Sequence, residues 1–251
     1  MIELSNVSYR YEGIVALKDI SFRIEKGEAI CLLGPNGSGK STLLKLLNGI
    51  LLPCSGSYRF KMEEITQKKL QNSEFSKAFH QKIGFVFQNS ETQLFCSDVY
   101  DEIAFGPRQM GLEEKEVEER VKDCLNLLNI LELQHRQPYH LSGGEKRKVA
   151  IACVLSLNPE VLVLDEPMNG LDPRTQRWLL EFLSQLNKSG KTIITATHNL
   201  DLVEEISQRS ILFDEGHCLV ADKETLAMMQ DLDLLKRVNL VDEYYPRHKA
   251  R

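Results

Sequence analysis

A glycine-rich segment, GPNGSGKST at positions 34–42, carries the residues best suited to chemistry. It fits the pattern G-x-x-x-x-G-K-[ST] and follows the apolar run AICLLG, which predicts a buried strand. Such glycines let backbone N–H groups surround phosphate oxygens, and the helix expected from Lys40 to about Asn48 adds its positive end. Lys40 can reach the β- and γ-phosphates, and the Ser41 hydroxyl can bind Mg²⁺. The predicted phosphate-binding residues are Gly34, Pro35, Asn36, Gly37, Ser38, Gly39, Lys40, Ser41 and Thr42.

A pair of carboxylates follows a second apolar run in VLVLDEP. Pro167 indicates that the strand ends here, so Asp165 and Glu166 need not point to opposite sides. Asp165 is placed to hold Mg²⁺ through water, and Glu166 can polarise a water molecule aimed at the γ-phosphate. Two acids after an apolar run more often mark only a strand end. Together with the phosphate loop they indicate nucleotide hydrolysis.

Three later segments extend the same prediction. In LSGGEKRK, Ser142, Gly143 and Gly144 place a hydroxyl and bare backbone amides at a helix N-terminus, which is an anion site. A plain helix cap would explain the serine but not the glycine pair. The segment GLDP follows the carboxylates. His198 ends the apolar run KTIITATH at the expected carboxyl edge of the sheet, where such folds bind ligands, although a lone histidine there is more often structural.

The pattern of elements predicts an α/β fold. Strands in IELSNVSYRY and ALKDISFRIEKG alternate apolar and polar residues, whereas later apolar runs alternate with helices, as in a parallel sheet with crossovers. Residues 90–157 are mainly helical and predict a subdomain inserted into that core. Residues 61–82 are polar and predict a solvated surface connection. The inserted part contains an amphipathic helix with apolar positions at Val117, Val121, Leu125 and Leu128.

Composition restricts the classes of protein that fit. The 251 residues carry a net charge of −5, which gives no reason to expect a nucleic-acid partner. Six cysteines, none spaced as CxxC, predict reduced thiols in a cytosolic protein. We expect no signal peptide, and no run of about 18 apolar residues could span a bilayer. Other chains would have to form any transport pore.

Taken in order, these segments resemble the ATPases of ABC transporters, and the resemblance covers essentially residues 1–220. It implies an α/β fold with a P-loop NTPase core, a mainly parallel sheet, an N-terminal antiparallel β subdomain and an inserted α-helical subdomain. The domain would span residues 1–225, with the insertion at about 90–157 and a helical tail at 226–251. The implied ligands are ATP and Mg²⁺.

The resemblance also implies roles for single residues. Tyr11 occupies the position where this family stacks an aromatic ring on adenine, although an exposed strand tyrosine is the alternative. Glu145 replaces the glutamine often found after the glycine pair. The implied segments are a Walker A loop at Gly34–Thr42, a Q-loop at Gln88, the signature at Leu141–Glu145, a Walker B strand at Val161–Asp165, catalytic Glu166, a D-loop around Asp172 and a switch histidine at His198. The catalytic set would be Glu166, His198, Gln88 and Lys40; the Mg²⁺ ligands Ser41, Gln88 and Asp165; further nucleotide contacts Tyr11, Ser142, Gly143, Gly144 and Asp172.

In this family two ATPase subunits meet head to tail, and each ATP lies between the phosphate loop of one and the signature of the other. Signature amides that point away from Lys40 have no anion in their own chain, so they need a second subunit. Gln88 would sense Mg²⁺ and the attacking water. His198 would hold the γ-phosphate and orient that water with Glu166. Both a homodimer and a heterodimer fit the sequence.

The segment FQNSETQLFCSDVYDEIAFGPRQMGL, residues 87–112, is the best guide to the type of transporter. It predicts a short apolar helix, a Gly-Pro break and a charged helix, which either pack the subdomain or form a groove for a helix of a membrane partner. It resembles the cobalt and energy-coupling-factor importers. That implies uptake of a metal ion (cobalt or nickel) or a vitamin through membrane-embedded coupling and substrate-binding subunits, with this chain at the cytoplasmic face of the cell membrane.

Other hypotheses remain open. One is a soluble ABC ATPase acting on ribosomes or DNA, although the chain has one cassette and no coiled-coil or zinc insertion. Another is a non-catalytic partner in a heterodimer, against which stand Lys40, Glu166 and His198. An exporter of the same cassette type is a third. The tail DLDLLKRVNLVDEYYPRHKAR matches no motif, and a terminal surface helix is expected there rather than a dimerisation helix.

Overall fold

The computed structural model describes residues 1–242 and 245 of the chain. The first third forms a four-stranded antiparallel sheet in the order β2-β1-β4-β5. Leu4 and Val7 are both buried despite their odd spacing, because a bulge with Asn6 at φ 50° shifts the register between them. The strands are β1 Ile2–Tyr11, β2 Ile14–Ile24, β4 Ser55–Phe60 and β5 Glu63–Glu64.

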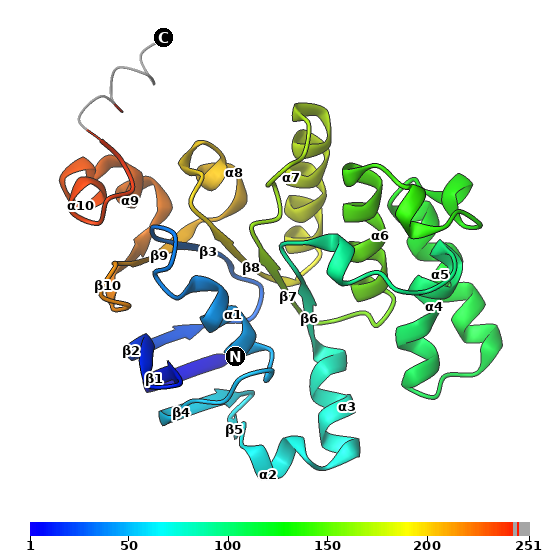
Figure 1. Ribbon diagram of the computed structural model, residues 1–251, viewed down its shortest axis with the longest axis horizontal. Helices are drawn as coiled ribbons and strands as arrows, with labels where there is room; N and C mark the ends of the chain where they lie inside the picture. The colour runs from blue at the N-terminus through cyan, green and yellow to red at the C-terminus, as the bar shows by residue number, and fades with distance from the viewer. Residues whose placement is uncertain (243–244, 246–251) are drawn as a thin grey trace.

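A six-stranded sheet in the order β10-β9-β3-β8-β7-β6 forms the centre of the molecule, and β10 alone runs antiparallel to its neighbour (Figure 1). Every residue of β3, β6, β7 and β8 is buried, which explains the continuous apolar runs in the sequence. The strands are β3 Ala29–Leu33, β6 Ile83–Val86, β7 Val161–Asp165, β8 Thr192–Thr197, β9 Arg209–Phe213 and β10 Leu219–Glu224.

The parallel register brings the ends of these strands to one edge. Leu33 at the end of β3 pairs with Thr197 of β8, and Asp165 at the end of β7 pairs with Ala196. The phosphate loop, the carboxylates and His198 are therefore neighbours at the carboxyl edge of the sheet, as predicted.

Helix α1 (Lys40–Leu47) begins at the phosphate loop and packs between the two sheets. Tyr58 of β4 donates a hydrogen bond from its hydroxyl to the Leu47 carbonyl at 2.7 Å, which satisfies one of the last carbonyls of the helix. Asn48 ends the helix, as expected, and its amide bonds the Ile83 carbonyl of β6 at 2.9 Å. The helix buries Leu43, Leu44, Leu46 and Leu47.

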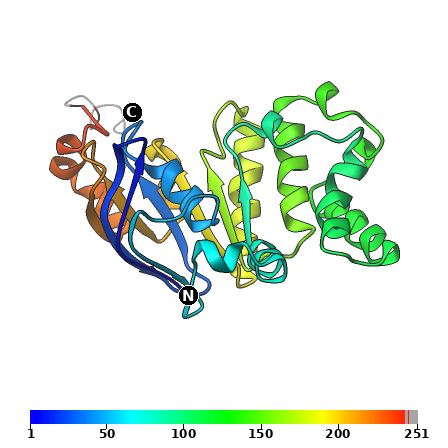
Figure 2. The same cartoon turned by 60° about the horizontal axis from the view of Figure 1, so that its bottom comes forward.

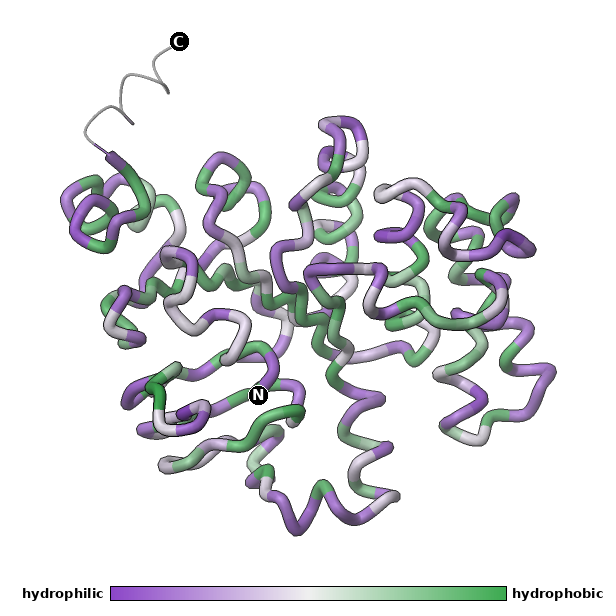
Figure 3. The backbone as a smooth tube through the Cα atoms, viewed as in Figure 1, coloured by the Kyte–Doolittle hydropathy of each residue, from purple (hydrophilic) through white to green (hydrophobic). Residues whose placement is uncertain are grey.

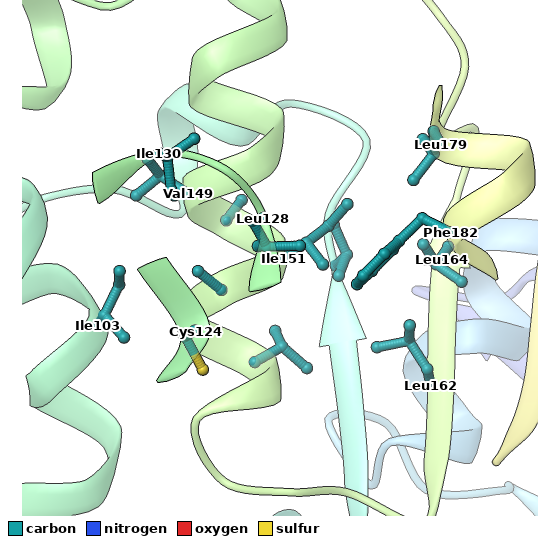
Figure 4. Close-up of a cluster of buried hydrophobic side chains, with 14 of the residues drawn as sticks. Ile103, Cys124, Leu128, Ile130, Val149, Ile151, Leu162, Leu164, Leu179 and Phe182 are labelled. Atoms are coloured by element: carbon teal, nitrogen blue, oxygen red, sulfur yellow. The ribbon is translucent and has the colours of Figure 1, made fainter. Parts of the chain in front are cut away.

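Three helices of the inserted subdomain gather at one end of the molecule, away from the N-terminal sheet (Figures 1 and 2). They are α4 (Val99–Gln109), α5 (Glu114–Leu127) and α6 (Gly143–Leu155). Figure 4 shows their side chains meeting those of β7 and of α7 (Pro173–Lys188), so the insertion and the central sheet share one core. The predicted amphipathic helix is confirmed as α5, with Val117, Val121, Leu125 and Leu128 all buried.

Residues 61–82 are mostly exposed, as predicted for a solvated surface connection, but the prediction missed the regular elements that they form. The segment contains β5 and two helices, α2 (Gln67–Leu70) and α3 (Ser73–Lys82). Thr66 and Asn72 cap these helices. Phe79 is buried, so a helix that is mostly polar still packs one aromatic side chain into the core.

The Gly-Pro pair that was expected to break a helix lies inside α4, so that expectation was also wrong. Gly106 allows close packing, because a Cβ there would lie 3.3 Å from the side chain of Leu157. The helix ends instead near Gly111, whose φ is 81°. The Leu112 amide closes this end by bonding the Pro107 carbonyl at 3.2 Å.

The last described elements are α9 (Thr225–Gln230) and α10 (Leu232–Arg237), which follow β10. Their buried residues, including Met228 and Leu235, pack against β3 and β9. Residues 226–242 of the expected tail thus place an apolar face on the central sheet, and the rest of the tail, apart from Tyr245, lies outside the described residues. Figure 3 shows the apolar segments concentrated in the central strands.

Among the described residues, no helix is long and apolar enough to cross a membrane. Shorter helices are α8 Val203–Ile206, η1 Ser90–Thr92, η2 Leu131–Leu133, η3 Pro138–His140 and η4 Leu200–Leu202.

Candidate nucleotide-binding site

The phosphate loop requires glycine at two positions for steric reasons. A Cβ on Gly34, whose φ is 153°, would lie 2.6 Å from the Ser38 hydroxyl and 2.8 Å from the Phe213 carbonyl oxygen. A Cβ on Gly39, whose φ is 103°, would lie 2.2 Å from the carbonyl oxygen of Ala16 in β2. The loop is thus pressed between β9 and β2, which fixes its backbone for phosphate binding.

Lys40 begins α1 and turns its side chain back over the loop. Its Nζ donates hydrogen bonds to the carbonyls of Gly34 at 2.7 Å and Pro35 at 2.9 Å. Burial lowers the pKa of Lys40, while the carboxylates of Glu166 and Asp165 oppose that shift. Gly39 caps the helix without a side-chain acceptor, so the first N–H groups of α1 remain available to an anion.

Asp165 ends β7 with its carboxylate buried, and one oxygen, Oδ1, has no hydrogen-bond partner among the described residues. Burial raises the pKa of Asp165, and a hydrogen bond from Ser41 opposes the shift. A buried carboxylate oxygen without a partner beside a serine hydroxyl is the donor set that suits Mg²⁺. These residues therefore fit the predicted metal.

Glu166 directly follows β7 in a left-handed conformation, with φ 44°. Its carboxylate accepts hydrogen bonds from the Thr197 hydroxyl at 3.0 Å and from the His198 amide at 3.1 Å. The His198 ring nitrogen Nδ1 lies 2.6 Å from the same carboxylate. The histidine is about half exposed while the glutamate is buried, so the pair lies between the protein interior and the site. The sequence did not predict the role of Thr197.

A cavity of about 550 Å³ connects most of these groups. Its lining includes Tyr11 and Ile14, which is 73% exposed, together with the carboxylate–histidine pair. Five other residues of the lining were not predicted, because their positions at strand ends and turns depend on the fold rather than on local spacing. They are Ile14, Val15, Ala16, Asn169 and His217. The predicted residues in the lining are Tyr11, Asn36, Gly37, Gly39, Lys40, Ser41, Thr42, Gln88, Glu166 and His198.

Gln88 is exposed at the end of β6, next to the inserted subdomain. Arg147 of α6, buried in the interior, donates hydrogen bonds to the carbonyls of Phe87 and Gln88, both at 2.7 Å. The backbone that positions Gln88 is therefore bonded to the helix that carries the signature. Nothing in the sequence pattern had singled out Arg147.

The signature lies outside this cavity. Ser142 caps α6 in a capping box with Glu145, whose pKa is lowered by hydrogen bonds from the Ser142 amide and hydroxyl. A Cβ on Gly144 would lie 3.1 Å from the hydroxyl oxygen of Thr175 in α7, so packing explains this glycine. A Cβ on Gly143 would meet no atom of the described residues within 4 Å, so packing against them does not explain that glycine.

Asp172 caps the first turn of α7. Its carboxylate accepts hydrogen bonds from the Thr175 hydroxyl and from the amides of Thr175 at 3.1 Å and Arg174 at 3.0 Å. The Thr175 hydroxyl bond is the main cause of the lowered pKa of Asp172, and the amide bonds add to it. Thr175 in turn is the residue against which Gly144 packs. The segment around Asp172 and the signature thus have neighbouring positions in the fold.

The chain is similar in sequence to known ATP-binding proteins, as the geometry of the phosphate loop and the carboxylates indicates. The family model for the ABC transporter matches residues 17–169. The nickel import ATP-binding protein LarO of Lactiplantibacillus plantarum is 50% identical over 222 residues, covering 88% of this chain and 92% of that protein. The chain belongs to the ABC transporter family. It is an ATPase subunit of that family and binds ATP.

Further proteins similar to this ABC ATPase are also components of transporters. The energy-coupling factor transporter ATP-binding protein EcfA of Methanothermobacter thermautotrophicus is 41% identical over 96% of this chain and 76% of that protein. The structure of cbiO1 from Clostridium perfringens, part of the ABC transporter complex cbiONQ, has a TM-score of 0.82 at 34% identity, covering 100% and 98%. The dimeric structure of the bacterial ABC transporter cassette MJ0796 has a TM-score of 0.80 at 28% identity, covering 90% and 99%.

Proposed function

We propose that this ABC ATPase powers an importer of the energy-coupling-factor type, which takes up a metal ion such as cobalt or nickel, or a vitamin, through separate membrane subunits. The observation that carries the proposal is an aromatic groove on the inserted subdomain, beside Gln88. The names of its relatives support the choice of importer: nickel import for LarO, energy coupling for EcfA, and the cbiONQ complex for cbiO1.

The groove has a volume of about 250 Å³, and its lining includes aromatic side chains from β6 and from the inserted subdomain. Phe95 is 68% exposed and Phe105 is 42% exposed, and their ring centroids lie 5.0 Å apart in a T-shaped arrangement. Phe87, next to Gln88, lines the same groove. An apolar side chain from a partner helix in this groove would contact the backbone that positions Gln88. We assign that helix to the membrane-embedded coupling subunit, which places the ATPase at the cytoplasmic face of the membrane.

In this proposal Glu166 acts as the general base, because its carboxylate is oriented toward the site by Thr197 and His198. His198 orients the attacking water with Glu166, and Lys40 neutralises the β- and γ-phosphates. Ser41, Asp165 and Gln88 would hold Mg²⁺, which supplies charge neutralisation on the phosphate oxygens. Tyr11, which is 41% exposed, lines the same cavity, and its ring would stack on adenine.

The signature serves a second subunit in this proposal. Gly143 lies exposed at the N-terminus of α6 with open space around it, and it lies outside the cavity of its own chain. Two chains arranged head to tail would place these amides on the phosphates bound by the partner. Ser142, Gly143, Gly144 and Asp172 would lie at that interface, in a homodimer or a heterodimer.

The test is co-purification from gently solubilised membranes, with partners identified by mass spectrometry. We expect the tagged chain to recover a multi-span coupling protein and a small substrate-binding membrane protein. The Phe95→Ala and Phe105→Ala variants should lose both partners, whereas Met62→Ala, a change to a still more exposed apolar residue (78%) in the turn between β4 and β5, should retain them. Recovery of ribosomes, DNA-repair proteins or only the chain itself would contradict the importer proposal and leave the ATPase activity unaffected.

A further inference from the structure

His217 lines the nucleotide cavity from a turn that none of the sequence motifs includes. It lies between β9 and β10, and it shares the cavity with Ile14, Val15 and Ala16 of β2. Ile14 pairs with Tyr11 of β1, and the Ala16 carbonyl oxygen abuts Gly39, so these three residues connect Tyr11 to the phosphate loop. His217 therefore lines the part of the cavity between Tyr11 and the phosphate loop.

Hydrogen bonds hold the turn in this position. The His217 amide bonds the Asp214 carbonyl at 3.2 Å, and the Cys218 amide bonds the Asp214 carboxylate at 2.9 Å. The His217 carbonyl accepts a hydrogen bond from the Lys18 amide of β2 at 3.0 Å. Lys18 is two residues beyond Ala16, whose carbonyl oxygen abuts Gly39. The turn is thus bonded to the same strand that supports the phosphate loop.

The backbone and the ring of His217 both suggest a role for its side chain. Its φ is +62°, at the left-handed position of a three-residue hairpin loop where glycine is favoured. The ring nitrogen Nδ1 is buried and has no hydrogen-bond partner among the described residues, while the residue as a whole is partly exposed. Nδ1 is unpaired in either neutral tautomer, but a buried N–H without an acceptor is rarer in proteins than an acceptor without a donor, which favours the tautomer with its proton on Nε2. The ring therefore presents a single donor, Nε2–H, on its accessible side.

We propose that His217 is a nucleotide-binding residue that donates a hydrogen bond from Nε2 to the sugar or the α-phosphate of the bound nucleotide. Both groups offer oxygen acceptors in the middle of the cavity, and neither changes when the γ-phosphate is removed. The contact should contribute equally to ATP and ADP binding. It requires only that this chain binds ATP, and it does not depend on which solute the transporter carries.

The test is isothermal titration calorimetry on the full chain with unmodified ATP and ADP, since a fluorophore on the ribose would occupy the same space. His217→Ala should weaken both nucleotides by the same factor, about 2- to 10-fold, the effect of one hydrogen bond. His217→Gln can place an amide N–H near the position of Nε2 and should bind within about twofold of the native chain. His217→Asn tolerates the left-handed backbone but is too short, so it should be as weak as His217→Ala.

Controls separate this contact from damage to the turn. Glu215→Ala changes an exposed residue of the same turn and should leave both affinities unchanged. Without nucleotide, the unfolding temperatures of the Ala and Gln variants should be similar to each other and not above that of the Asn variant, because Asn tolerates the left-handed backbone better. A difference in affinity between Gln and Ala therefore cannot come from damage to the turn. With a 2′- or 3′-deoxynucleotide, the loss caused by His217→Ala should vanish if the acceptor is that hydroxyl and should persist if it is the α-phosphate. Unchanged affinity in His217→Ala, a loss confined to ATP, or equal weakness of the Gln and Asn variants would overturn the proposal.

Discussion

Three charged residues at the site, Lys40, Asp165 and Glu166, are each 6% exposed. Burial lowers the pKa of Lys40 and raises the pKa of Asp165, so both groups are less easily charged in the folded protein than in water. Their charges are only partly compensated within the chain. A bound nucleotide with its cation would supply the missing partners, and ligand binding should therefore stabilise the fold.

Replacing Glu166 with glutamine removes the proposed base while keeping the size of the side chain. We expect Glu166→Gln to lower ATP turnover by ~10²- to 10⁴-fold, the usual effect of losing a general base, with ATP affinity retained. Steady-state phosphate release and calorimetry measure the two quantities. Hydrolysis near the native rate would exclude Glu166 as the base.

Asp165→Asn should separate stability from function. Because the folded-state pKa of Asp165 is raised, its ionised form costs stability at neutral and alkaline pH, and the cost falls as the pH drops through that pKa. Without Mg²⁺ and nucleotide at pH 8, the Asn variant should unfold a few degrees higher than the native chain, while its hydrolysis is lost. The advantage should shrink toward acid pH. Thermal unfolding at several pH values checks this, and an advantage that grows toward acid would refute the assignment.

At the scale of elements, sequence patterns predicted those parts of the fold that depend on local periodicity. The structure confirms the buried strands and the helices α1, α5 and α6. It also confirms that the phosphate loop, the carboxylates and His198 lie together at the carboxyl edge of the sheet. The patterns failed at α3, where one buried Phe79 sufficed for packing, and at α4, which accommodates Pro107. They also missed Thr197 and Arg147, because hydrogen bonds between distant segments leave no periodic signal.

The two signature glycines should respond differently to substitution. Gly144→Ala forces its new methyl group to within 3.1 Å of Thr175 and should lower the stability of the fold by ~1 kcal/mol. Gly143→Ala meets open space and should keep or slightly raise stability, since alanine favours helix over glycine. If Gly143 faces the phosphates of a partner, its variant should nevertheless lose hydrolysis. Denaturant unfolding and ATPase assays on both variants decide this, and full activity in Gly143→Ala would contradict the proposed interface.

At the scale of the whole molecule, the fold separates the phosphate loop from the signature, so one chain offers two half-sites. We expect Glu166→Gln to form a dimer with ATP and to return to monomer with ADP, as measured by light scattering after gel filtration. The double variant with Lys40→Ala should stay monomeric, because it lacks the γ-phosphate contact. A monomer under every condition would indicate that the partner in the dimer is a different ATPase chain.

The left-handed backbone at Glu166 also has a consequence for how such a protein can evolve. At φ 44° every residue with a Cβ is strained, and glycine or asparagine fits better than glutamate. A duplicated copy can therefore lose its base by a substitution that relaxes the fold rather than damages it. Selection for stability alone would favour that loss, so only selection for turnover keeps the carboxylate. Inactive sister cassettes are thus easily reached by mutation and would persist wherever one working site per pair suffices.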